Sequence, residues 1–68
     1  MSIEWLDGSE IHVSVEQGET VISANREGLH SLAMQLKRLA EEAPGSHIHY
    51  DENNSLEDGS TELIIERT

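Results

Sequence analysis

The stretch 25-NREGLHSLAMQLKRLAEEAPG-45 decides the fold. Its apolar residues recur at spacings of three and four, the period of one face of an α-helix. They are Leu29, Leu32, Ala33, Leu36, Leu39, Ala40 and Ala43. Asn25 is placed as an N-cap, Glu27 suits the positive end of the helix dipole, and 44-PG-45 stops the helix. The pattern predicts an amphipathic helix with these residues on its solvent side: Gln35, Lys37, Arg38, Glu41 and Glu42.

The segments on both sides of this helix have the period of β-strands. Strict alternation in 10-EIHVSVE-16 predicts a half-buried strand, and the glycine of 17-QGE-19 suits a tight turn into a second strand at 20-TVIS-23. After the helix, 46-SHIHY-50 alternates with Ile48 and Tyr50 inward. A polar loop at 51–60, with Leu56 turned into the core, leads to a last strand at 61-TELIIER-67, with Leu63 and Ile65 inward.

The order of these elements predicts a single α+β domain over residues 1–68. Its expected architecture is ββαββ, with one amphipathic helix packed on a mostly antiparallel four-stranded sheet. The placement of Met1–Leu6 stays open. Because Ile3 and Trp5 alternate and 7-DG-8 is a turn signal, an extra short N-terminal strand is compatible with the sequence.

Charge is the strongest global feature of the chain. Its 68 residues include 14 acidic and 4 basic side chains, for a formal net charge of -10. Eight carboxylates and no Lys or Arg lie between Arg38 and Arg67. Phosphate binding needs Lys and Arg, so we expect neither nucleic acid nor an anionic membrane as a partner. Either solubility or the recognition of a basic protein explains such a surface.

Cysteine usage and hydropathy point to a cytoplasmic protein. The chain has no Cys, which excludes disulfides and thiolate-ligated metals. No apolar run approaches the roughly 20 residues that cross a bilayer, and MSIEWLDGSE is not a signal peptide.

The segment 46-SHIHYDEN-53 is the one candidate metal site. His47, His49 and Asp51 share one face of a strand, and His12 on an earlier strand offers a fourth ligand. Successive same-face positions lie about 6.5–7 Å apart, which is wide for ligands of one ion. We therefore interpret these residues as the outward polar face opposite Ile48 and Tyr50 and expect no metal or cofactor. The alternative function is that of a small metal-binding or homodimeric regulatory module.

The sequence contains no arrangement typical of catalysis. No serine stands in a G-x-S-x-G context, and the paired carboxylates are neighbours in sequence, so they point in different directions. General acid–base catalysis needs a cleft that shifts a pKa, and a chain with one helix has little room for one. We therefore expect a protein that is not an enzyme.

Two apolar runs interrupt the strand alternation. In Val21–Ile22 and Leu63–Ile65, one residue of each run must face away from the helix. We predict that Ile22 and Ile64 form an apolar strip on the outer face of the sheet. Three candidates for covering this strip stay open: the N-terminal segment with Trp5, a second copy in a homodimer, or another protein.

Three segments together resemble a known family: 25-NREGLHSLA-33, 47-HIHYD-51 and 56-LEDGSTELIIER-67. The chain is similar to the small bacterial immunity proteins of polymorphic-toxin systems, in the family catalogued as number thirty-two. The resemblance implies a non-enzymatic protein that binds and neutralises a co-encoded toxin; it assigns no binding residues. A compact acidic domain suits a basic toxin domain, and the carboxylate run supplies the expected contacts. These are Asp51, Glu52, Glu57, Asp58, Glu62 and Glu66.

Overall fold

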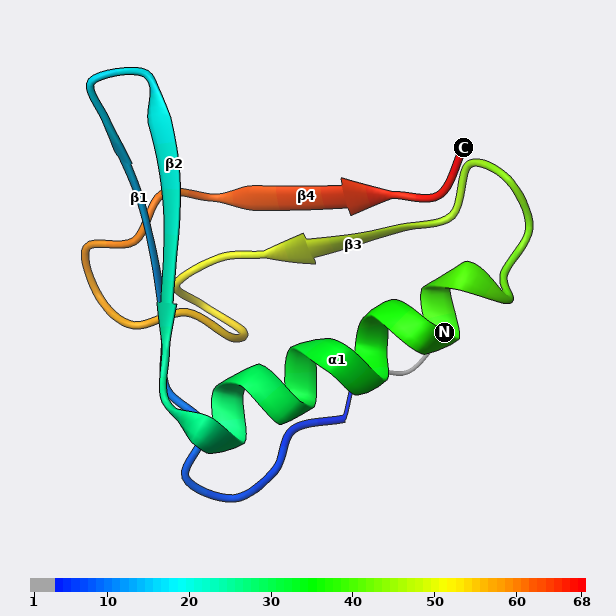
Figure 1. Cartoon of the computed structure of the whole chain (residues 1–68), viewed down its shortest axis with the longest axis horizontal. Coiled ribbons are helices and arrows are strands. Elements are labelled where there is room, and N and C mark those ends of the chain that lie inside the picture. The colour runs from blue at the N-terminus through cyan, green and yellow to red at the C-terminus, as the bar shows by residue number, and fades with distance from the viewer. Residues whose placement is uncertain (1–3) are drawn as a thin grey trace.

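The computed structural model, which describes residues 4–68, has one helix and four strands in these residues (Figure 1). Their order is β1 (Ile11–Glu16), β2 (Glu19–Ala24), α1 (Arg26–Ala40), β3 (His47–Tyr50) and β4 (Leu63–Glu66). Both strand pairs are antiparallel. The expected α+β class and ββαββ order are confirmed.

The strands form two separate pairs, β1–β2 and β3–β4, where one four-stranded sheet was expected. The loop before β4 explains the interruption, because it lies along the second edge of β1. The backbone N–H groups of Glu57 and Thr61 donate to the carbonyls of Ile11 and Val13 at 2.8 and 2.7 Å. Val13 N–H donates to Ser60 Oγ at 3.2 Å. This loop satisfies the edge of β1 that a neighbouring strand would otherwise pair with.

The turn between β1 and β2 has the conformation that its glycine indicates. Gln17 and Gly18 both have positive φ, 50° and 81°. Two consecutive residues with positive φ match the twist of the flanking strands in a two-residue hairpin. The turn therefore sets the register in which Glu16 pairs with Glu19 and Ile11 with Ala24.

The helix begins where predicted. Asn25 is the N-cap, and its side chain accepts a hydrogen bond from Gly28 N–H at 2.8 Å. The helix ends at Ala40 with Glu41 as its C-cap, so the chain leaves the helix before reaching Pro44. In the described residues, no helix is long and apolar enough to cross a membrane.

The buried face of α1 is rotated away from the predicted apolar stripe. Its buried residues are Gly28, Ser31, Leu32, Gln35 and Leu39. Leu29 and Leu36, both expected inside, are 55% and 43% exposed. Gln35, expected on the solvent side, is 2% exposed, so that prediction is wrong. Leu32 and Leu39 alone anchor the helix through aliphatic side chains.

A hydrogen-bond network explains why polar residues are buried on α1. Ser31 Oγ accepts from Leu6 N–H at 2.9 Å, and Gln35 Nε2 donates to the Glu4 carbonyl at 2.8 Å. Tyr50 Oη donates to Gln35 Oε1 at 2.8 Å. The helix thus supplies the partners that the backbone of residues 4–6 needs when it packs against the protein.

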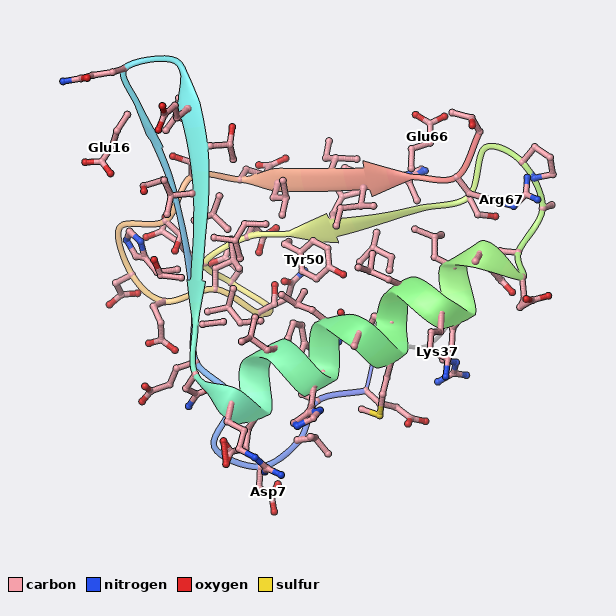
Figure 2. All side chains as sticks on the ribbon, viewed as in Figure 1. Asp7, Glu16, Lys37, Tyr50, Glu66 and Arg67 are labelled. Atoms are coloured by element: carbon pink, nitrogen blue, oxygen red, sulfur yellow. The ribbon has the colours of Figure 1, made fainter. Side chains whose placement is uncertain are left out.

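This N-terminal segment adopts no strand in residues 4–10, and Ile3 lies outside the described residues. The turn predicted at 7-DG-8 is present, with Gly8 at φ 82°. Trp5 packs against the core and meets Tyr50 edge-on, with ring centroids 6.1 Å apart. Figure 2 shows Tyr50 between β3 and α1.

Buried hydrophobic residues come from β1, α1, β3 and the following loop. They are Ile11, Val13, Leu32, Leu39, Ile48, Tyr50 and Leu56. The predicted inward positions of Ile48, Tyr50 and Leu56 are confirmed, and Leu63 and Ile65 of β4 pack against them half-buried.

The strip predicted from Ile22 and Ile64 does not form. Ile22 pairs with buried Val13, so its side chain lies on the core face of β1–β2, although it is 42% exposed. Ile64 pairs with His49 on β3–β4 and faces outward, 52% exposed. The two residues belong to different strand pairs, and Trp5 packs on Tyr50 in the core.

Candidate protein-binding surface

The outer face of β3–β4 gathers polar and apolar side chains at one place. Alternation along the strands puts His47 and His49 of β3 on the same side as Ile64 and Glu66 of β4. Glu62 joins this side, because its Oε1 lies 3.8 Å from His49 Nδ1. These five residues, called the outer face below, surround an exposed isoleucine with two carboxylates and two imidazoles.

The two histidines of the outer face lie against each other. Their ring centroids are 4.9 Å apart, and the rings meet edge to face. His47 Nδ1 lies 3.3 Å from the Gly45 carbonyl oxygen. Both rings are therefore positioned by local contacts on the surface of the strand.

The other candidate metal ligands do not join this pair. Asp51 Oδ1 accepts from the backbone N–H groups of Asn53 and Asn54 at 2.9 and 3.1 Å. His12 belongs to β1, on the other strand pair. Among residues 4–68, no group of three His, Cys, Asp or Glu side chains could hold a metal ion.

Two carboxylates of the acidic loop hold the loop together. Asp51 caps the turn that follows β3, and Glu52 Oε2 accepts from Gly59 N–H at 2.7 Å. With Leu56 buried, these bonds fix the path of residues 51–60. The side chains of Glu57 and Asp58 stay exposed.

The six carboxylates expected at the site therefore fall into three groups. Asp51 and Glu52 stabilise the loop, Glu57 and Asp58 project from it, and Glu62 and Glu66 flank Ile64 on the outer face. Figure 2 shows Glu66 near the end of β4. Glu62 lies one residue before β4 and Glu66 ends it, and four residues of extended chain span about 13 Å.

Few cations balance this surface. The ion pairs in the described part of the chain are Arg38 with Glu4 at 3.3 Å and His49 with Glu62 at 3.8 Å. The second requires a protonated imidazole. The exposed carboxylates of Glu57, Asp58 and Glu66 are in no ion pair within residues 4–68, and their combined field attracts basic groups over a range of about 8–10 Å at physiological salt.

Carboxylates at the turn of β1–β2 were not among the expected site residues. Glu16 and Glu19 are cross-strand partners in the register of this pair, and both are exposed. Figure 2 shows Glu16 at the turn end of the strand pair. The sequence indicates that these two carboxylates lie together, because a two-residue turn at Gln17–Gly18 places their positions opposite each other.

Two further features bear on chemistry at the surface and in the core. A shallow depression of about 420 Å³ is lined by Glu42, Pro44, Gly45, Ser46 and His47, next to the outer face.

In the core, burial raises the pKa of the Tyr50 phenol. Its hydroxyl is engaged with Gln35, which makes Tyr50 a structural group.

Comparison with known proteins places the chain in a family. The model of the family described as immunity protein 32 matches residues 19–68, from the first residue of β2 to the end of the chain. No curated protein and no solved structure matches the chain. The matched range includes α1, β3, β4 and the whole acidic loop, which agrees with the resemblance seen in the sequence. Because the match covers well over half of the chain, this protein belongs to the immunity protein 32 family.

Proposed function

We propose that this chain is a non-enzymatic immunity protein that binds a co-encoded bacterial toxin in the cytoplasm of the producing cell and blocks it. The observation that carries the proposal is the family match over residues 19–68. Partner binding accounts for the surface described above, since the chain displays its carboxylates without matching cations.

Charge supports a basic toxin domain as the partner. The chain carries a formal net charge of -10, and complementary charge accelerates encounter and disfavours acidic competitors. Nuclease domains and other toxins that act on phosphate-bearing substrates need basic clefts. An acidic surface placed over such a cleft would exclude the substrate.

The outer face and the acidic loop are the proposed contact surface. Interfaces place apolar side chains at the centre and polar groups at the rim, and Ile64 between Glu62 and Glu66 fits that arrangement. Glu57 and Asp58 extend it along the loop. Asp51 and Glu52 contribute by holding the loop in shape.

Charge reversal tests this assignment. The probe is the purified toxin domain encoded together with this chain, and its affinity is measured at low salt by calorimetry. We expect Glu62→Lys/Glu66→Lys and Glu57→Lys/Asp58→Lys each to weaken binding by at least about tenfold. The matched control is Asp7→Lys/Glu10→Lys, which changes net charge equally at exposed positions beside the N-terminal end of α1, away from Glu66 (Figure 2), and should weaken binding less than about threefold.

Growth of cells that express the toxin domain provides the functional readout. The wild-type chain should restore growth, and the two surface variants should restore it less well than the control. If the wild-type chain neither binds the toxin domain nor protects the cell, the proposed function is wrong. If all three variants bind equally well, the contact surface lies elsewhere.

A further inference from the structure

One edge of the β1–β2 pair is covered by a loop, and the other edge is open. Residues 57–61 cover the edge of β1, with bonds to Ile11 and Val13. Nothing in residues 4–68 pairs with the other edge, which belongs to β2 (Figure 1). Five of its six residues are exposed.

The register identifies which backbone groups β2 presents at its open edge. Asn25 N–H donates to the Glu10 carbonyl, and in an antiparallel ladder such bonded pairs recur at every second residue. Ser23, Val21 and Glu19 therefore bond to β1. The N–H and C=O groups of Thr20, Ile22 and Ala24 point away from it. The same alternation explains why Ile11 and Val13, their cross-strand neighbours on β1, bond to the covering loop.

This edge lacks the features that block strand pairing. Proteins protect open edges with charged side chains, proline, bulges or short strands. The segment 20-TVISA-24 has no charged residue, no proline and no glycine, and its register with β1 is unbroken. By contrast, β4 has only four residues, one of them Glu66, whereas β2 has five uncharged residues after Glu19. The edge of β2 is thus the longer and less protected of the two.

The surroundings of the edge define the chemistry of an incoming strand. Glu16 and Glu19 lie directly opposite each other at the turn end, an arrangement in which like charges repel. Neither is in an ion pair with another residue of the described part of the chain. Lys or Arg on the incoming strand would remove this repulsion. A second copy of this chain would add a further net charge of -10.

We propose that the open edge of β2 accepts an extended, basic strand of the toxin, which adds a third strand to β1–β2; this rests on the proposed function. Backbone hydrogen bonds to Thr20, Ile22 and Ala24 provide the pairing. Val21 and Ile22 project to opposite faces of β2 and give the incoming strand an apolar contact on each side. A Lys or Arg of the strand meets Glu16 and Glu19.

Hydrogen exchange of the wild-type chain tests the pairing directly. Within β2, only the donors of the open edge should change when the toxin domain is bound. The amides of Thr20, Ile22 and Ala24 should exchange quickly in the free chain and at least about tenfold more slowly in the complex. The amides of Val21 and Ser23, which bond to β1, should be protected in both states.

Proline substitution tests the same edge by affinity. The N–H of Ile22 is not used within the β1–β2 pair, so Ile22→Pro removes an outward donor and spares the ladder. We expect toxin affinity to fall at least about tenfold, because a buried carbonyl of the partner loses its donor. Ile22→Val keeps the N–H and a branched apolar side chain, and it should retain most of the affinity. Circular dichroism checks that each variant is folded.

The outcomes separate this inference from the proposed function. A toxin that binds tightly while the three amides stay unprotected overturns the edge assignment and leaves the proposed function standing. A toxin that does not bind the wild-type chain overturns both. Protection of the same amides in a concentrated sample of the chain alone, with a dimer in sedimentation, overturns the assignment in favour of a second copy.

Discussion

Gly28 lies where the first turn of α1 passes over the start of β1. A Cβ at this position would lie 2.8 Å from the Glu10 carbonyl oxygen and 3.0 Å from Ile11 Cγ1. Alanine normally favours a helix over glycine by about 1 kcal/mol. Here the contact with rigid backbone reverses the sign, and we expect Gly28→Ala to lower the free energy of unfolding by about 1–3 kcal/mol, as measured by urea denaturation.

Ala33 provides the control for this substitution. It is exposed on the same helix, so Ala33→Gly tests helix propensity without a tertiary contact. It should cost about 1 kcal/mol. If Gly28→Ala instead stabilises the protein, the close approach of α1 to β1 in the structure is wrong.

Tyr50 should make the protein sensitive to alkaline pH. Burial raises the pKa of its phenol in the folded state, while the unfolded chain keeps a pKa of about 10. Between these two values the unfolded state has lost a proton that the folded state retains. Stability is therefore complete below about pH 10 and falls above it, by up to about 1.4 kcal/mol per pH unit.

Urea denaturation at a series of pH values measures this loss. Tyr50→Phe is the control, because Tyr50 is the only tyrosine in the chain. The variant should be less stable at neutral pH, since Gln35 Oε1 loses its donor, yet it should lack the decline that starts near pH 10. The same decline in both proteins would rule Tyr50 out as its cause.

Local sequence predicts the residues whose role depends on neighbours along the chain. Asn25 as a cap, Gly18 in a turn and the inward Ile48 belong to this group. Ser31 and Gln35 do not, because their partners are backbone groups of residues 4–6 and the Tyr50 hydroxyl. Helical periodicity predicts that a glutamine lies on the surface. It cannot predict that the backbone of a segment distant in the sequence needs hydrogen-bond partners from that glutamine.

Asn25 joins two elements at the start of α1. Its Oδ1 accepts from Gly28 N–H and from Glu10 N–H, and its Nδ2 donates to the Gly8 carbonyl. Loss of an N-cap alone costs about 0.5–2 kcal/mol. Because the side chain also fixes the entry to β1, we expect Asn25→Ala to lower the free energy of unfolding by about 2 kcal/mol, at the top of that range.

Asn25→Asp separates the two roles of this side chain. It keeps the acceptor for Gly28 and Glu10 and removes only the donor to Gly8. Its loss of stability in thermal or urea denaturation should be smaller than that of Asn25→Ala. An equal loss in the two variants would mean that the bond to Gly8 carries the effect and that the cap contributes little.

At the level of elements, the sequence identifies the helix and the strands more accurately than it identifies which face of each element is buried. All five elements lie within about two residues of the expected ranges, apart from the earlier end of α1. The buried face of α1 differs because Gly28 lets one side of the helix approach β1. That leaves Leu29 and Leu36 in water. The approach of α1 to β1 and the exposure of these two leucines both depend on packing between elements that are distant in the sequence.

The same distinction applies to the candidate site. The carboxylate run marks an acidic surface in the sequence, but only the structure assigns Asp51 and Glu52 to the loop's own hydrogen bonds. The open edge of β2 is also invisible in sequence. It follows from the loop at 57–61 covering β1 and leaving β2 bare.

At the scale of the whole molecule, the net charge of -10 should make salt act in opposite directions on stability and on binding. Salt screens repulsion among carboxylates within the folded chain, so unfolding midpoints should rise from about 10 mM to about 0.5 M NaCl. The affinity for a basic toxin domain should fall over the same range. The variant Glu57→Lys/Asp58→Lys should gain less stability from salt. A midpoint that falls with salt would show that self-repulsion does not limit stability.

The range matched by the family model does not contain the whole core. It begins at Glu19 and omits β1, which supplies Ile11 and Val13, both essentially inaccessible to solvent. Burying two such side chains contributes about 3–6 kcal/mol, and a chain of this size is stable by only about 3–10 kcal/mol. We propose that residues 1–68 fold as one domain and expect residues 19–68 alone to show neither a cooperative thermal transition nor the circular dichroism of a folded α+β protein.

The control for this truncation lengthens the turn and keeps the strand. Two glycines inserted between Gln17 and Gly18 leave β1 attached, and a longer exposed loop adds only a small entropic cost. The inserted chain should retain a cooperative transition. Trp5, which packs on Tyr50, reports whether the N-terminal segment still docks, through its fluorescence. A folded 19–68 fragment would show that β1 is dispensable, and the seven-residue core would then have to reform without its two β1 members.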